Sequence, residues 1–323
     1  MRRRTLLASL PVAMGAASAA AQPRWPTQPL RLIVVYPPGG LSDGMARLLA
    51  ERLQAQLGVA VRVDNRAGGG GSVGLQALAR AAPDGHTLAY SAVSPLTLRP
   101  HLQADGTGVD PLRGIAPVAG VMFTPVLVVG TPAFTGRDFA ALLAQARARP
   151  GALRWATSGI ATAGHLVLEQ VQAGAGVRVT HVPYKGGGQQ LNDALAGQFE
   201  LLSTNVAAAQ LQHVAAGRFT PLAVGAPQRL DVLPQVPTFA ELDLAQANVS
   251  SLFGLYAPPG TPPALLDRLN AETNRALAEP SVRERIVASD NLPAGGSRAG
   301  FARRIDEEWM ANRVLRSSGI RLE

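Results

Sequence analysis

The feature that most constrains the fold of this chain is a repeated order of apolar strand, short glycine-rich loop and helix. Leu30–Tyr36 is a nearly unbroken apolar run, and after residues 37–40 (PPGG) apolar side chains recur at helical spacing as far as Leu57. An unbroken apolar run predicts a strand buried on both faces, and its alternation with helices predicts βαβ units. The sequence therefore favours an α/β fold with mostly parallel sheets covered by helices.

The same order returns on both sides of a strand expected near Pro125. Glycine-rich or small-residue loops follow expected strands at residues 66–74, 91–95, 157–164 and 184–188. The carboxyl ends of parallel strands meet at one edge of a sheet, so these loops and their helix N-termini are expected to gather there. Free backbone N–H groups and the helix dipole favour anions, and glycine permits close approach. Two such lobes predict a clamp for a small anion, most simply a carboxylate.

Composition narrows the class of protein. The chain has 323 residues, 47% of them hydrophobic, and is long enough for two domains. It holds no cysteine, which excludes disulfides, thiol catalysis and iron–sulfur ligation. Its 30 Lys and Arg residues exceed its 22 Asp and Glu residues, but the arginines are scattered and Lys185 is the single lysine. Because no basic stripe is interleaved with aromatic residues, nucleic-acid binding is not expected.

The first residues read as an export signal. Arg2–Arg4 form a charged start, Thr5–Ala17 an apolar centre, and Ala19–Ala21 offers small residues for cleavage. We therefore expect residues 1–21 to be removed near Ala21 and the mature protein to be exported. No other run approaches the roughly 18 uninterrupted apolar residues of a membrane-spanning helix.

Residues 40–44 (GLSDG) match the G-x-S-x-G pattern of a hydrolase nucleophile elbow, and so do residues 70–74 (GGSVG). The pattern alone is weak, because a nucleophile also needs a histidine and an acid that meet it in space. Ser42, directly before Asp43, is interpreted instead as the N-cap of the following helix. A secreted serine hydrolase that uses Ser42 or Ser72 stays open as the alternative, since five histidines could supply partners.

No cofactor and no metal are expected. Gly69, Gly71 and Gly74 fit the G-x-G-x-x-G pattern of a dinucleotide site, but the connection from strand to helix is long and no acid follows about 20 residues later. The histidines are isolated, without an H-x-x-x-H pair or a carboxylate at ligand spacing.

Short motifs in a consistent order extend from about Trp25 to the C-terminus. They are residues 29–34 (PLRLIV) leading to 37–43 (PPGGLSD), 64–70 (DNRAGGG), 83–88 (PDGHTL), 181–186 (HVPYKG), 233–238 (LPQVPT) and 257–262 (APPGTP). With these motifs the chain resembles the Bug, or TctC-like, extracytoplasmic solute-binding receptors of tripartite tricarboxylate transport systems.

This resemblance implies a two-lobed periplasmic binding protein of the type II-like fold, each lobe a mostly parallel sheet flanked by helices. It implies a discontinuous domain 1 (residues 22–125 and 225–323), a domain 2 (residues 126–224), and hinge crossings near Pro125 and in the turn-rich stretch 225–237. Such receptors are not enzymes. They close on a small organic carboxylate, such as a di- or tricarboxylate, an acidic amino acid or an aromatic acid. A monomer in the periplasm is expected, with membrane transporter subunits as partners; whether it serves uptake or a membrane sensor stays open.

The resemblance also implies which residues hold the ligand. They are Pro38, Gly39, Gly40, Asp43, Gly70, Gly71 and Ser91 in the first domain, and Thr157, Ser158, Gly159, Tyr184, Gly186 and Gly187 in the second. The backbone amides of Gly39 and Gly40 are expected to face the ligand while Asp43 holds the loop. Two departures from the family pattern bear on the ligand: Thr204 replaces a usual acid and Leu252 a usual tryptophan. If that acid normally binds an ammonium group, its loss disfavours amino-acid ligands.

Overall fold

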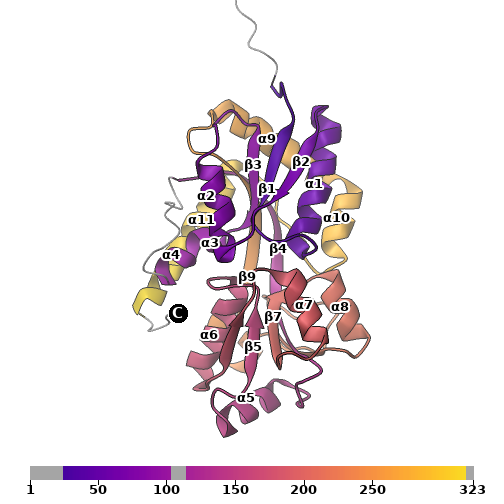
Figure 1. Ribbon diagram of the computed structural model, residues 1–323, viewed down its shortest axis with the longest axis vertical. Helices are drawn as coiled ribbons and strands as arrows, with labels where there is room; N and C mark the ends of the chain where they lie inside the picture. The colour runs from indigo at the N-terminus through magenta and orange to yellow at the C-terminus, as the bar shows by residue number, and fades with distance from the viewer. Residues whose placement is uncertain (1–24, 103–113, 318–323) are drawn as a thin grey trace, which may run out of the picture.

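The computed structural model describes residues 25–102 and 114–317, which form two lobes joined by long strands (Figure 1). The strands that run between the lobes are β4 (Ala116–Gly130) and β9 (Ser250–Ala257). The expected export signal lies outside the described residues. None of the described helices is long and apolar enough to cross a membrane.

Helices cover both faces of the sheet in the first lobe. Its elements are β1 (Leu30–Val34), β2 (Val61–Asn65), β3 (Thr87–Ala92), β10 (Leu292–Pro293), α1 (Leu41–Leu57), α2 (Ser72–Ala79), α3 (Ser94–Thr97), α4 (Arg99–Leu102), α9 (Pro263–Ala278), α10 (Pro280–Val287) and α11 (Arg298–Asn312). Leu30, Leu32 and Val34 pack in the core shared with α1, α9 and α10. Ile33 and Val35 pack in the core shared with α2, α3 and α11. The apolar run of β1 is unbroken because both of its faces are buried.

The second lobe repeats this arrangement. Its elements are β5 (Arg154–Thr157), β6 (Thr180–Pro183), β7 (Leu201–Asn205), β8 (Thr220–Gly225), α5 (Phe139–Ala148), α6 (Ala163–Ala175), α7 (Gly187–Leu195) and α8 (Ala208–Ala215). Val126 and Val128 of β4 pack in the core with α5 and α6, whereas Leu127 and Val129 pack in the core with α7 and α8. Single turns of 3₁₀ helix occur at Gly69–Gly71, Ala240–Leu242, Ala245–Ala247 and Arg313–Ser317.

One sheet of ten strands runs through the described part of both lobes in the order β2-β1-β3-β9-β4-β7-β5-β6, with β8 and β10 also paired to β4. The two-lobed α/β prediction is confirmed, but the sheet is mixed. Parallel pairs join β1 to β2 and β3, and β5 to β6 and β7. The long strands β4 and β9 run antiparallel to their neighbours. This pairing brings the carboxyl ends of the parallel strands of both lobes toward the junction between them.

The crossings between the lobes lie at defined points of β4 and β9. Pro125 is the last residue of β4 paired with β9, and Val126 is the first paired with β7 and β8. Residues 226–249 still contribute side chains, such as Phe239, to a core of the second lobe. The division into domains stays a prediction, and these contacts favour a return crossing near Ser250 rather than in residues 225–237.

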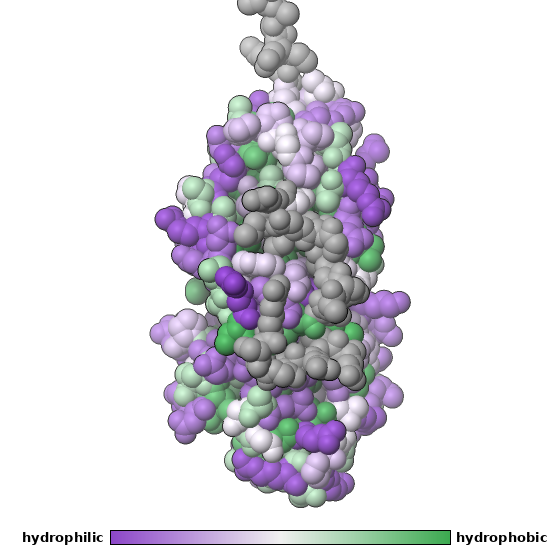
Figure 2. Space-filling view, turned by 90° about the vertical axis from the view of Figure 1, so that its left-hand side faces the viewer, coloured by the Kyte–Doolittle hydropathy of each residue, from purple (hydrophilic) through white to green (hydrophobic). Residues whose placement is uncertain are grey.

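Hydrophilic and apolar residues are interspersed over the visible part of both lobes (Figure 2). The ion pairs of the described residues lie mostly on the surface, such as Arg31 with Asp64 and Arg229 with Glu241. Exposed pairs of this kind contribute little to stability.

Candidate functional site

The loop between β1 and α1 begins the site. Helix α1 starts at Leu41 with Gly40 as its N-cap, and no side chain caps it. The prediction that Ser42 is the N-cap is therefore wrong, because Ser42 already lies inside the helix as its second residue. Asp43 fixes the loop instead, since its Oδ2 accepts a hydrogen bond from the amide of Gly39 at 3.0 Å.

Asp43 is buried, and both of its carboxylate oxygens are engaged. Oδ1 accepts from Nδ2 of Asn65 at 2.9 Å, and Oδ2 accepts from Nε of Arg47 at 3.0 Å. Burial opposes ionisation of Asp43, but the hydrogen bonds from Arg47, Gly39 and Asn65 outweigh it and hold its pKa below the usual value. Because Gly39 donates its N–H to Asp43, the loop amides left for a ligand are those that begin with Gly40.

A cavity of about 100 Å³ lies between the lobes at this loop. The N-termini of three helices reach it, through Gly40 at α1, Gly187 at α7 and Ala207 at α8. Each N-terminus offers backbone N–H groups without an intrahelical acceptor, together with the positive end of a helix dipole. Among the described residues, no Asp, Glu, Lys, Arg or His lines the cavity. The described lining therefore offers backbone N–H groups and neutral polar side chains rather than charged ones.

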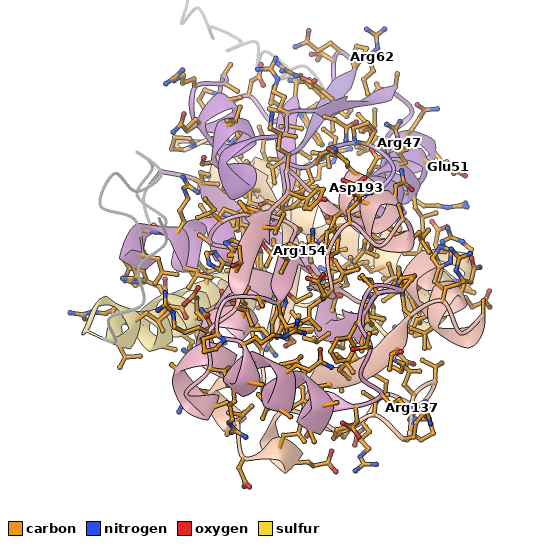
Figure 3. The ribbon with its side chains drawn as sticks, turned by 60° about the horizontal axis from the view of Figure 1, so that its bottom comes forward. Arg47, Glu51, Arg62, Arg137, Arg154 and Asp193 are labelled. Carbon is orange, nitrogen blue, oxygen red and sulfur yellow. The ribbon has the colours of Figure 1, made fainter. Side chains whose placement is uncertain are left out.

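Asp43 holds the Gly39 amide beside the cavity, and other charged side chains are spread over the molecule (Figure 3). Figure 3 shows Arg62 and Arg137 at opposite ends of the molecule, and Arg47 on α1. Arg154 of β5 is paired with Glu200, with 2.6 Å between Nη2 and Oε1.

Four of the residues expected to bind the ligand line the cavity: Gly39, Gly40, Ser158 and Gly187. The others do not line it, and among them Gly186 and Gly70 are close contact points between the lobes. A Cβ atom on Gly186 would lie 2.4 Å from Cδ of Pro37, and one on Gly70 would lie 2.5 Å from the carbonyl oxygen of Ile160. Glycine at these two positions lets the backbones of the lobes approach each other. At both points the two lobes are in contact.

The remaining first-lobe residues support the loops. The carbonyl oxygen of Pro38 lies against Gly188 of α7, and Gly71 packs closely on Pro95. Ser91 is buried at the end of β3, where its hydroxyl donates to the carbonyl oxygen of Ala92 at 2.8 Å.

The remaining second-lobe residues are engaged with their own lobe. The hydroxyl of Thr157 donates to the carbonyl oxygen of Gly159 at 3.2 Å and lies 2.7 Å from Nε2 of His181. The hydroxyl of Tyr184 donates to Oδ2 of Asp193 at 2.7 Å. Burial, together with this hydrogen bond and the charge of Asp193, raises the pKa of Tyr184 to about 12. These residues shape the loops and do not line the cavity.

Sequence reasoning missed several residues that line the cavity, chiefly Tyr36, Phe253, Gln190 and Gln210. Gln190 follows the glycines of the expected loop at residues 184–188 by two positions, so counting one turn into the expected helix could have found it. Gln210 stands on α8, which the sequence analysis does not predict. Of the two departures from the family pattern, Thr204 lines the cavity and Leu252 does not.

Residues 25–102 and 114–317 hold no catalytic arrangement that the hydrolase alternative would need. Ser72 donates its hydroxyl to the carbonyl oxygen of Gly69 at 3.0 Å, and no histidine there is hydrogen-bonded to Ser42 or Ser72. His165 and His181 stack on each other with ring centroids 3.9 Å apart. Within the same ranges, no three His, Asp or Glu side chains are grouped to hold a metal.

Two lobes joined by crossing strands, with helix N-termini directed at a cavity between them, define a two-lobed solute-binding protein. The family model described as "Tripartite tricarboxylate transporter family receptor" matches residues 45–317. The chain belongs to this family, which is known as TctC or Bug, and members of it are receptors rather than enzymes.

Relatives and solved structures agree with this assignment. The chain is 34% identical to the protein BugT of Bordetella pertussis over 96% of this chain and 95% of BugT. The structure of Rpa4515 of R. palustris with adipate superimposes with a TM-score of 0.85 at 30% identity, covering 91% of this chain and 98% of the other. MatC from Rhodopseudomonas palustris with bound malate gives a TM-score of 0.85 at 26% identity, covering 90% and 100%.

Proposed function

We propose that this chain is a periplasmic receptor that captures a small organic carboxylate between its lobes and delivers it to the membrane subunits of a tripartite tricarboxylate-type transporter. The observation that carries the proposal is the convergence of three helix N-termini on one interlobe cavity with no charged side chain in its described lining. Backbone amides at helix N-termini bind carboxylates without a titrating group. The adipate and malate held by two structural neighbours support the ligand class.

Capture works by lobe closure. The ligand carboxylate accepts hydrogen bonds from the N-terminus of α1 in the first lobe and from those of α7 and α8 in the second. A ligand that contacts both lobes binds the closed form better than the open form and shifts the population toward it. The closed form is the one that transporter subunits would recognise, with the receptor acting as a monomer after removal of residues 1–21.

A ligand screen tests the proposal. Protein freed of copurified ligand by unfolding and refolding is heated with mono-, di- and tricarboxylates, amino acids and aromatic acids. A ligand at about 100 times its Kd should add about 2.7 kcal/mol of stability, which a melting-temperature scan resolves. Isothermal titration then gives the Kd of each compound that raises the melting temperature.

The same panel separates this proposal from the alternatives. Amides of the same acids, without any carboxylate, should give no shift. If no carboxylate raises the melting temperature, the proposal is contradicted. Ester turnover that disappears in Ser42→Ala or Ser72→Ala would establish the hydrolase instead. A sensor would still evoke its response to the ligand in cells that lack the transporter subunits.

A further inference from the structure

Two glutamines on the second-lobe wall of the cavity have no hydrogen-bond partner among the residues that the structure describes. Gln190 on α7 is 0% exposed and Gln210 on α8 is 1% exposed. For both side chains, neither the carboxamide oxygen nor the nitrogen has a partner. Both residues line the interlobe cavity. The cavity is therefore bordered by two acceptors and two NH₂ donors that the protein leaves unsatisfied.

Such groups are costly in a closed cleft. A buried donor or acceptor left unpaired loses its hydrogen bonds to water without gaining any in return. In contrast, Asn205 in the same lining donates to the carbonyl oxygen of Thr124 at 3.3 Å and to the hydroxyl of Ser251 at 2.8 Å. The fold thus pairs the NH₂ group of one carboxamide in the lining, whereas the carboxamides of Gln190 and Gln210 are left for whatever the cavity encloses.

The pattern of free groups fits an uncharged partner better than a second carboxylate. A carboxylate only accepts hydrogen bonds, so it can pair with the two NH₂ groups but leaves both carboxamide oxygens unpaired and facing negative charge. No cation in the described lining offsets that charge. A group that both donates and accepts can pair with the oxygen of one glutamine and the nitrogen of the other.

We propose that Gln190 and Gln210 form a specificity subsite for the end of the ligand remote from the carboxylate, and that this end carries an uncharged donor–acceptor group, of which a carboxamide is the simplest. This inference rests on the proposed function. It adds that a diacid binds more weakly than its half-amide of equal length.

Isothermal titration with matched pairs tests the subsite. The probes are adipate against adipamate and succinate against succinamate, on refolded, ligand-free protein at pH 7.5. The half-amide should bind at least about tenfold more tightly than the diacid in one pair or both, since a site built to pair donors and acceptors rejects a ligand that cannot pair them. Gln190→Leu and Gln210→Leu should each reduce that preference to less than about threefold.

Matched controls lie on the same two helices. Gln189 of α7 and Gln212 of α8 are exposed, so Gln189→Leu and Gln212→Leu should keep the wild-type preference. The melting temperature of ligand-free protein gives a second readout. Gln190→Leu should raise or preserve it, because a buried unpaired amide is replaced by an apolar side chain of similar size, whereas a purely structural role would lower it.

The outcomes of the titrations distinguish a failure of the subsite from a failure of the proposed function on which it rests. Diacids that bind as tightly as their half-amides, or a half-amide preference that survives both leucine variants, would overturn the subsite and leave the carboxylate receptor standing. The subsite is likewise overturned if neither pair binds while another carboxylate of the panel does. If no carboxylate binds at all, the proposed function itself fails.

Discussion

The two walls of the cleft are built in opposite ways. In the first lobe, the loop after β1 is tied together by Asp43, which accepts hydrogen bonds from Gly39, Arg47 and Asn65. In the second lobe, the side chains of Gln190 and Gln210 border the same cavity without a partner. The first wall is complete before a ligand arrives, and the second is completed by what the cleft encloses.

This difference suggests a division of labour. A pre-ordered loop with free amides at the start of α1 should bind any carboxylate, because its backbone N–H groups interact with the charged group itself. Unpaired side chains on α7 and α8 discriminate between ligands through the groups they pair with. Substitutions in the first wall should therefore weaken the binding of all ligands alike. Substitutions in the second wall should change the order of affinity among the ligands.

The largest effect is expected where the two walls meet. In Gly186→Ala the new Cβ would lie 2.4 Å from Cδ of Pro37, so the lobes cannot close as they do here. Affinity for each carboxylate should fall by about 50-fold or more, because the closed, binding-competent form becomes rare. Titration calorimetry measures the loss, and small-angle scattering should show a form that stays open with ligand present.

Gly217→Ala is the matched control for backbone strain. Gly217 has φ +67°, but a Cβ there meets nothing within 4 Å. The variant should lose some stability and keep its affinity. Wild-type affinity in Gly186→Ala would show that the walls need not meet at this point.

A smaller, uniform effect is expected in the first wall. Asp43→Ala removes the acceptor for Gly39 and the partner of Arg47 and Asn65, so the loop loses its fixed shape. We expect a roughly five- to tenfold weaker Kd for diacids and half-amides alike, and about 1–3 kcal/mol lower stability. Glu51→Ala, also on α1 but with an exposed side chain, should change neither quantity. A changed order of affinity among the ligands in Asp43→Ala would contradict the separate roles of the two walls.

The smallest expected effect on binding is that of pH. The prediction compares the cleft with a second cavity on the other side of the sheet. The cleft lining described here holds no group that titrates between pH 6 and 8, so affinity should stay flat over that range. Glu308 on α11 borders a separate cavity of about 330 Å³. Burial raises its pKa to about 7, although the hydroxyl of Thr97 donates to it.

Because the folded pKa of Glu308 exceeds its ordinary value of 4.5, the folded state holds this proton more tightly. The contribution of Glu308 to stability is fully present below about pH 4.5 and is lost as pH rises from there through 7, by up to about 3 kcal/mol in all. Melting scans at pH 5.5 and 8 should show a larger drop in the wild type than in Glu308→Gln. An equal drop in both proteins would assign the pH dependence to other groups.

Much of the fold follows from local patterns. The apolar run of Leu30–Tyr36 and the glycines after it predict β1 and the start of α1, because a strand buried on both faces needs apolar residues at each position. Residues 184–188 likewise predict a loop ahead of α7. The N-cap of α1 was missed because Ser42 fits the residue preference for a cap, whereas the actual start was decided by how the loop packs against Asp43.

The antiparallel course of β4 and β9 was not predicted, because parallel and antiparallel pairing look alike in a short apolar run. Gly186 and Gly70 lie where the lobes touch, and their contact with the ligand stays a prediction. A glycine in a loop indicates close approach, and the sequence does not say to what.

By itself the sequence determined the α/β class, the two lobes and the family, since each of these depends on order and spacing along one chain. It also predicted helix N-termini that favour anions. Tertiary structure alone decided which amides stay free, which glycines separate the lobes and which side chains face the cavity. The carboxamides of Gln190 and Gln210 became significant only when folding buried them beside one cavity and gave them no partner, because burial makes an unpaired polar group costly.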